Sequence, residues 1–251
     1  MREQGATPWC FGLEAQGATG WAATDWIEDM VLRMSGPDIY ERWMAGDVAF
    51  SDPAIREPFE AFRSLVLVPG SVAGGIPGVL RTSVSDSASG LFGEPADCVL
   101  HRQASFAFTW FPQELQFGPD GDIDFFVLPG IDETEAPLVV GSTVAVAFDD
   151  RPAVEQVMAY LATPESTRVW AEAGGHLTPH NTSAADDLPE ADQRALDLLL
   201  EASVIQPDAS DAMKPEIGSD LLWQEITRWV TGTTTYDQFA ATLDEAISKP
   251  N

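Results

Sequence analysis

The stretch YLATPESTRVWAEAGGHLTPH, residues 160–180, carries clear helix start and stop signals. Thr163 can cap a helix, Pro164 suits the first helical turn, and the glycines at 174 and 175 suit a helix end. The segment RPAVEQVMAYLA just before it, residues 151–162, has the spacing of an amphipathic helix. We therefore predict two consecutive helices, the second ending at Gly174 and Gly175.

Upstream of these helices the hydrophobic period changes. The runs DCVLHRQASFAFTWF (97–111), DIDFFVLPG (122–130) and VVGSTVAVAF (139–148) are rich in apolar and β-branched residues. Such short runs are typical of strands. The sequence therefore predicts a fold of mixed α and β structure, in the α/β class.

The opening part of the chain is predicted to be helical. Thr24 is the expected N-cap of a helix that runs to about Met34. A short helix is expected over 39–44. Ser51 or Asp52 then precedes a run with apolar residues at helical spacing, which predicts a third helix.

The closing part is also predicted to be helical. The segment SDLLWQEITRWV at 219–230 is followed by TYDQFAATLDEAIS, in which Thr235 and Gln238 have the spacing of a capping box. Residues 69–90 are rich in Gly, Ser, Val and Pro and predict a loop with one small helix. The segment 183–193 is expected to hold exposed helix starts and turns.

The charge of the chain limits its partners. Lys and Arg total 13 against 40 Asp and Glu, which gives a net charge of −27 spread along the sequence. This charge argues against binding of nucleic acid or of an anionic membrane surface. No apolar run approaches the roughly 20 residues of a membrane-spanning helix, and MREQGATPW has neither a basic nor an apolar leader. The expected protein is soluble, with no membrane insertion.

Two cysteines are present, Cys10 and Cys98. An even count without metal-ligand spacing fits one disulfide or two buried thiols. Both lie in short strand-like runs, PWCFGL and DCVLHRQ, which favours the disulfide.

The order of several segments resembles the extracellular solute-binding proteins of ABC sugar importers, and most closely the α-glucoside and maltose-type members. The segment 160–180 and the closing pair of helices are the most specific parts of this resemblance, which covers essentially the whole chain. The other parts are LFGEPADCVLHRQASF, DIDFFVLPGID and VVGSTVAVAF.

The resemblance implies a periplasmic-binding-protein-like (type II) fold, in which two α/β lobes joined by crossing strands hold a sugar between them. By this match residues 1–129 form the first part of the second lobe, 130–180 return into the first lobe, and 181–251 return to the second. The family's opening lobe, with its export signal, has no counterpart in this sequence. We therefore expect the C-terminal part of a binding protein, with an apolar face left exposed at 130–180 and weak binding in isolation.

The implied function is capture of a sugar, an α-glucoside by the closest likeness, and its delivery to the membrane permease subunits of an ABC transporter. The expected location is extracellular or periplasmic. A missing N-terminal lobe on another chain is a further expected partner. No metal or cofactor is indicated, and no enzymatic reaction is implied.

Sugars present C–H faces that pack on aromatic rings, with hydroxyl groups around the rim. In maltose-type relatives an aromatic residue and a carboxylate reach the ligand from the connection that follows an FGL-like strand. This match implies that Trp21 stacks and that Glu14 accepts hydroxyl hydrogen bonds; the alternative is a core Trp and a solvated Glu. Trp223, at the start of the penultimate helix, matches the family's stacking Trp. Trp26 and Trp229 are expected in the core.

Further ligand contacts are implied in two other segments. Phe106 matches a cleft aromatic that is Trp in many relatives, and Gln103 is a candidate hydrogen-bond partner. Gly141 and Ser142 open the strand that re-enters the first lobe, where a small side chain lets the backbone approach a ligand. A plain strand start is the alternative reading of these two residues.

The histidines and the carboxylates raise two other kinds of site, a metal site and a glycosidase active site. His101, His176 and His180 are scattered, without the spacing that sets two metal ligands on one helix face. The carboxylates of Asp208, Asp211 or Glu14 would serve a glycosidase, whose chemistry needs a pair of carboxyl groups across the scissile bond. Asp208 and Asp211 are three residues apart on one turn, which makes this carbohydrate-active enzyme the weaker hypothesis. An incomplete, non-binding fragment that needs a partner lobe is the remaining alternative.

Overall fold

The computed structural model describes residues 1–131, 136–180 and 188–249. The chain forms two compact units, described separately here. Unit 1 comprises residues 1–102, 129–141 and 203–251, and unit 2 comprises residues 103–128 and 142–202. The chain therefore passes between the units four times.

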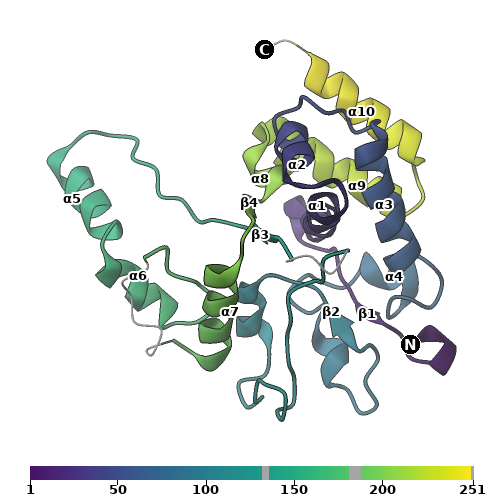
Figure 1. The fold of residues 1–251 in the computed structure, drawn as a ribbon, viewed down its shortest axis with the longest axis horizontal. Coiled ribbons are helices and arrows are strands. Elements are labelled where there is room, and N and C mark those ends of the chain that lie inside the picture. Colours follow the sequence, from purple (N-terminus) through teal and green to yellow (C-terminus); the bar gives the residue numbers. More distant parts are fainter. Residues whose placement is uncertain (132–135, 181–187, 250–251) are drawn as a thin grey trace. The chain divides into compact units, whose positions relative to one another are not determined.

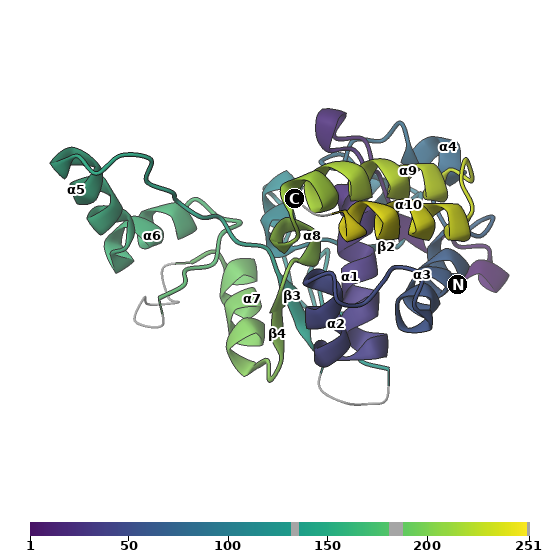
Figure 2. The ribbon, with the colours of Figure 1, turned by 90° about the horizontal axis from the view of Figure 1, so that it is seen from above.

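Unit 1 is helical around a central helix. In Figure 1 helix α1 (Trp21–Ser35) lies beside α3, and it also packs against α2 and α9. The other helices of this unit are α2 (Pro37–Met44), α3 (Pro53–Val66), α4 (Gly75–Val79), α8 (Ala209–Ala212), α9 (Trp223–Val230) and α10 (Tyr236–Ser248), and a π-helical segment, Ile217–Leu222, leads directly into α9. Figure 2 shows α9 and α10 lying side by side.

Aromatic side chains fill the core of unit 1. Phe59, Phe62, Trp229 and Phe239 are fully buried, and Phe59 contacts the rings of Trp229 and Phe239 at centroid distances of 5.4 and 5.1 Å. Trp26 joins this cluster through Phe62 at 5.8 Å. Tilted and edge-to-face ring pairs of this kind add stabilisation beyond the buried area. The prediction that Trp26 and Trp229 belong to the core is confirmed.

Two short parallel strand pairs complete unit 1. Strand β1 (Trp9–Cys10) pairs with β2 (Leu100–His101), and β3 (Leu138–Val140) pairs with β4 (Ile205–Pro207). A disulfide joins Cys10 to Cys98, with 5.3 Å between their Cα atoms. It therefore links the two segments that form the first strand pair.

Unit 2 contains a 3₁₀ helix, Ser105–Trp110, and helices α5 (Pro152–Leu161), α6 (Pro164–Ala171) and α7 (Glu190–Glu201). Thr163 caps α6, as predicted, by accepting a hydrogen bond from the Ser166 backbone N–H. The helix ends at Ala171, three residues before the predicted glycines. Gly174 and Gly175 then adopt positive φ in the turn that follows. The predicted segment 183–193 lies partly outside the described residues.

Most helix predictions are confirmed, with one corrected start. Asp52 caps α3 and Thr235 forms the predicted capping box with Gln238. Helix α1, however, begins four residues earlier than predicted, with Gly20 instead of Thr24 as its N-cap. Thr24 lies within the helix, where its hydroxyl donates to the Trp21 carbonyl oxygen at 2.8 Å. Its hydroxyl therefore bonds inside the helix instead of capping it.

The strand predictions are largely wrong. Of the run 97–111 only Leu100–His101 is a strand, and residues 122–130 form none. Of the run 139–148 only its first two residues belong to β3, and residues 141–148 are exposed. An alternating apolar pattern suits extended backbone, but a strand also needs a neighbour, and in the described part of the chain residues 141–148 have none. In the described residues no helix is long and apolar enough to cross a membrane.

Candidate ligand site at the start of helix α1

The starts of helices α1 and α9 touch at Gly20. Gly20 has φ +118°, and a Cβ atom added there would lie 2.3 Å from the carbonyl oxygen of Trp223 and 2.9 Å from Thr227 Oγ1. Both the conformation and the contact therefore require glycine. The Thr227 hydroxyl donates to that same carbonyl at 2.8 Å and lies 3.4 Å from the Thr19 carbonyl oxygen. The first residues of the two helices, Trp21 and Trp223, thus come from adjoining backbone.

Both of these tryptophans are only partly covered. Trp21 and Trp223 are half-buried, whereas Trp26 and Trp229 in the same unit are 1% and 0% exposed. The exposed part of each indole gives this end of unit 1 an aromatic surface. Partial exposure of two indoles is consistent with a ligand wall, the role that the resemblance implies for both residues.

Glu14 lies on the connection that leads to this surface. Its Oε1 accepts a hydrogen bond from the Gln16 N–H at 2.9 Å, and its own N–H donates to the Thr82 carbonyl at 3.1 Å. The side chain is half-buried. One carboxylate oxygen therefore shapes the turn before α1, and the proposed ligand contact of Glu14 stays a prediction.

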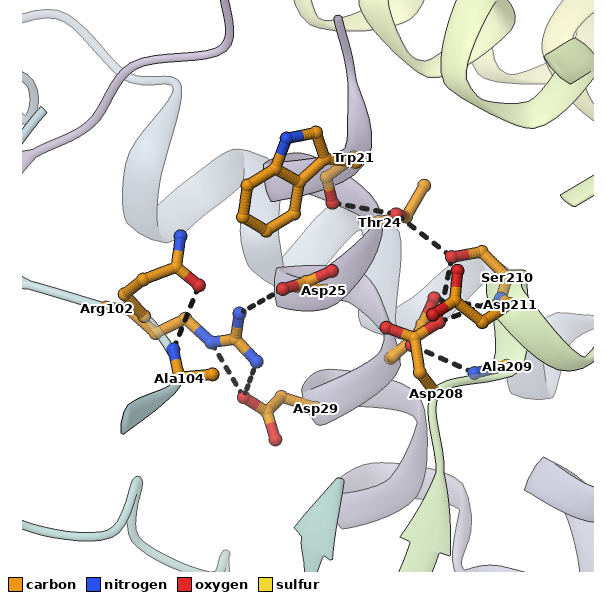
Figure 3. A network of polar contacts seen from close by, with 12 residues as sticks. Trp21, Thr24, Asp25, Asp29, Arg102, Ala104, Asp208, Ala209, Ser210 and Asp211 are labelled. Carbon is orange, nitrogen blue, oxygen red and sulfur yellow. Dashed lines mark hydrogen bonds and ion pairs between the residues drawn. The ribbon is translucent and has the colours of Figure 1, made fainter. Parts of the chain in front are cut away.

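A network of charged residues follows Trp21 along α1 (Figure 3). Asp25 and Asp29 succeed Trp21 at intervals of four residues, so the three side chains share one face of the helix. Arg102, which follows β2, places Nη1 3.3 Å from Asp25 Oδ2, and its Nε and Nη2 lie 2.8 and 2.5 Å from Asp29 Oδ2. Arg33 completes the row by donating to Asp29 Oδ1 at 2.7 Å.

The charges in this network shift each other's ionisation. Burial raises the pKa of Asp25 to about 7; the Arg102 cation opposes this rise, and the nearby Asp208 and Asp29 carboxylates add to it. For Arg102, burial lowers the pKa, but Asp29 and Asp25 outweigh that effect and hold it above its usual value. Asp25 therefore titrates near neutral pH while Arg102 stays charged.

Sequence reasoning missed Asp25 and Arg102. The segment TDWIEDMVLR shows carboxylates at helical spacing below Trp21, which was an available signal. The partner Arg102 is 77 residues away. Only the fold, which brings Arg102 to α1, reveals that the two side chains meet.

A second set of contacts ties α1 to α8. Glu28 is fully buried, and its two carboxylate oxygens accept the backbone N–H groups of Ala209 and Ser210 at 3.0 and 3.1 Å. Burial raises the pKa of Glu28, and the Asp208 and Asp25 carboxylates raise it further. Glu28 therefore occupies the start of α8 as a structural acceptor.

The carboxylates considered for a glycosidase have a structural role in the case of Asp208. Its Oδ1 accepts the N–H of Asp211 at 2.9 Å and the hydroxyl of Ser210 at 2.9 Å, so it is the N-cap of α8. Asp211 is exposed and lies within that short helix. A cap and an exposed residue of the same turn do not form an acid and base pair on opposite sides of a bond.

The histidines considered as metal ligands make separate contacts. His101 Nδ1 lies 3.0 Å from the Cys10 carbonyl oxygen, and burial lowers the pKa of His101. His176 packs on the Trp170 ring at 4.1 Å between centroids, and the His180 N–H donates to Thr178 Oγ1. In the described residues no group of three His, Cys, Asp or Glu side chains is arranged to hold a metal ion.

The other predicted ligand residues lie at or beyond the boundary of unit 1. Gly141 follows β3 directly, and Ser142 begins the next segment of unit 2; both are exposed. In unit 2, Gln103 Oε1 accepts the Ala104 N–H at 2.9 Å, and the half-buried Phe106 contacts the Trp110 ring at 5.2 Å. A shared site of Gln103, Phe106 and Ser142 with the unit 1 tryptophans stays a prediction.

Comparisons with known proteins show which proteins this chain is similar to. No protein-family model matches the chain. The chain is 34% identical over 232 residues to the osmoprotective compounds-binding protein GgtB of Synechocystis sp., a match that covers 92% of this chain and 54% of that protein. It is 34% identical over 241 residues to the alpha-glucosides-binding periplasmic protein AglE of Rhizobium meliloti, covering 94% of this chain and 52% of AglE. The chain thus spans about half the length of these relatives.

Solved structures show the same fold at low sequence identity. A chitin oligosaccharide binding protein matches with a TM-score of 0.76 and 14% identity, over 98% of this chain and 60% of that one. The bacterial solute receptor AcbH, described as having an exclusive substrate preference for β-D-galactopyranose, matches with a TM-score of 0.67 and 18% identity, over 98% of this chain and 61% of that one. GgtB, AglE and the chitin oligosaccharide protein are all named as binding proteins. The chain has part of the periplasmic-binding-protein-like, type II α/β fold.

Proposed function

We propose that this chain belongs to the sugar-binding component of an ABC importer and takes an α-glucoside as its ligand. Support comes from the named function of AglE, from the binding-protein fold and from the aromatic surface on unit 1. The ligand would be captured by stacking and hydrogen bonding and passed to permease subunits in the membrane. No bond would be made or broken, and the location would be extracellular or periplasmic.

The observation that carries this proposal is the pair of half-buried tryptophans. Trp21 and Trp223 begin two helices whose backbones touch at Gly20. The contact permits no side chain at position 20, so the backbone segments that carry the two indoles lie close together. A pre-positioned aromatic pair lowers the ordering cost of binding a flat sugar face.

The lobes follow from the same proposal. By this proposal residues 1–129 and 181–251 form the second lobe and residues 130–180 return into the first lobe, and Gln103, Phe106, Gly141 and Ser142 are further candidate ligand contacts. The matches cover only 54% of GgtB and 52% of AglE. A further lobe, on the same polypeptide or on another chain, would complete the proposed ligand site. A ligand that contacts both lobes would favour their closure.

The test is a titration of the purified chain with maltose, trehalose, sucrose and longer α-glucosides, followed by calorimetry and by tryptophan fluorescence. We expect saturable binding that Trp223→Ala reduces at least tenfold, because the ring face is lost. Trp223→Phe keeps an aromatic face and should retain most of the affinity. Trp170→Ala is the control, since Trp170 is an exposed indole on α6 in unit 2.

Turnover is measured in the same samples with chromogenic glycosides. Release of the chromophore that Asp208→Asn abolishes would replace this proposal with the enzyme hypothesis. Absence of sugar binding in a folded chain, at high sugar concentration, would show that the aromatic surface of unit 1 is not a sugar wall by itself.

A further inference from the structure

Asp25 and Arg102 reach the surface beside Trp21. Their side chains are 13% and 14% exposed, so each is nearly buried yet accessible at one edge. Trp21 lies one helical turn before Asp25, and Figure 3 shows the indole on the same side of α1 as the Asp25 carboxylate and the Arg102 guanidinium. The aromatic surface therefore has a charged pair at its border.

Both members of this pair keep unused hydrogen-bonding capacity. Asp25 Oδ2 receives Arg102 Nη1, whereas Asp25 Oδ1 accepts no hydrogen bond from the residues that the structure describes. Arg102 has five N–H donors and uses three of them on Asp25 and Asp29. One carboxylate oxygen of Asp25 and two N–H donors of Arg102 thus have no partner among the described residues.

By contrast, the neighbouring carboxylates have their acceptors occupied. Asp29 receives Arg102 on Oδ2 and Arg33 on Oδ1. Glu28 receives two backbone N–H groups. Of the acidic residues on this helix, Asp25 is the one whose free oxygen lies next to Trp21.

We propose that Asp25 and Arg102 recognise a vicinal diol of the sugar ring that stacks on Trp21. One hydroxyl group donates to Asp25 Oδ1, and its neighbour accepts from Arg102. This inference rests on the proposed sugar-binding function and adds the residues that read the hydroxyl pattern. A rigid pair with adjacent donor and acceptor selects against a ring that lacks either hydroxyl, because the unmatched group would lose its water without gaining a partner.

The ionisation of Asp25 should make ligand affinity depend on pH. A hydroxyl donor binds the carboxylate better than the protonated acid, so ligand affinity should increase as pH rises from about 6 to about 8. The charged groups that face Asp25 are Arg102, Asp208, Asp29 and Glu28. Arg102 stays charged throughout, and therefore the change follows the carboxyl group.

The experiment measures the binding of methyl α-glucoside and its monodeoxy analogues to the full chain by calorimetry or ligand-observed NMR. In the wild type, removal of either hydroxyl of one vicinal pair should reduce affinity about tenfold or more. Asp25→Ala removes the acceptor and should erase the discrimination at the donor hydroxyl, whereas Asp25→Asn keeps a carbonyl acceptor and should flatten the pH dependence. Glu57→Gln, which changes an exposed carboxylate on α3 outside this network, should change neither.

Three outcomes decide the inference. Loss of hydroxyl discrimination in Asp25→Ala, with thermal unfolding still cooperative, supports it. Sugar binding that Trp21→Ala weakens but Asp25→Ala leaves unchanged overturns it while the proposed function stands. No sugar binding by the wild type overturns both.

One further measurement does not depend on a variant. The ¹³Cγ signal of Asp25 should titrate near pH 7 in the free chain and at a lower pH with sugar bound, since binding favours the ionised form. An unchanged titration midpoint at saturating sugar contradicts the contact.

Discussion

At the scale of single residues, the fold raises the pKa of Asp25 to about 7. The sequence placed Trp26 and Trp229 correctly in the core, whereas the stacking role of the half-buried Trp21 and Trp223 stays a prediction. It did not reveal Asp25, because a carboxylate on an amphipathic helix is ordinarily solvated. Its burial and its ion pair depend on a partner far along the chain.

The stability of the protein should therefore depend on Asp25 in a defined direction. The native state holds the Asp25 proton up to about pH 7, while the ordinary pKa is 3.8, so the native state binds more protons in between. The free energy of unfolding consequently falls as pH rises through this window. Above about pH 7 the loss of stability is complete. Relative to the wild type, Asp25→Asn should gain stability with rising pH, as measured by urea unfolding at several pH values. The range from about pH 4 to about pH 8 spans the ordinary and the raised pKa of Asp25. A difference in unfolding free energy between Asp25→Asn and the wild type that stays constant over this range would contradict the raised pKa of Asp25.

At the scale of elements, helices were predictable and strands were not. Capping residues and apolar spacing are local, so α3, α6 and α10 follow from their own sequences. A strand requires backbone partners from elsewhere. In the described part of the chain the run 141–148 has none, and the run 122–130 has only an isolated bridge between Ile123 and Phe117. The predicted start of α1 was wrong because its N-cap is Gly20 and not the polar Thr24. Gly20 is needed there for its contact with α9, which lies far away in the sequence.

The contact of α1 with α9 gives a test at this scale. Gly20→Ala places a methyl group 2.3 Å from the Trp223 carbonyl oxygen and forces alanine to φ +118°. We expect a loss of about 2 kcal/mol or more in the free energy of unfolding, because backbone must move. Gly17→Ala is the matched control, since an added Cβ there meets nothing within 4 Å. Equal effects of the two substitutions in urea unfolding would rule out the close contact.

At the scale of the whole molecule, the disulfide is the main covalent constraint. Cys10 and Cys98 are separated by 88 residues, so the bond closes a long loop within unit 1. Its reduction, or the double substitution to Ser, should lower the free energy of unfolding by about 4 kcal/mol. Unfolding curves with and without reductant measure this loss. Coincident curves, together with two free thiols found under non-reducing conditions, would exclude the bond.

The division of the chain into two units shows which features of the whole molecule the sequence predicts and which it does not. The family resemblance predicted the fold class, and the solved binding proteins share it over 98% of this chain. Residue-level patterns could not show how segments far apart in sequence divide between units, because that division depends on long-range packing.

The measurement that tests the central claim most directly is calorimetric titration of the folded chain with α-glucosides, beside its Trp21→Ala, Trp223→Ala and Trp170→Ala variants. The account predicts saturable binding that weakens at least tenfold, or about 1.4 kcal/mol, in each of the first two variants and is unchanged in the third. Binding that survives the loss of both Trp21 and Trp223 would contradict it.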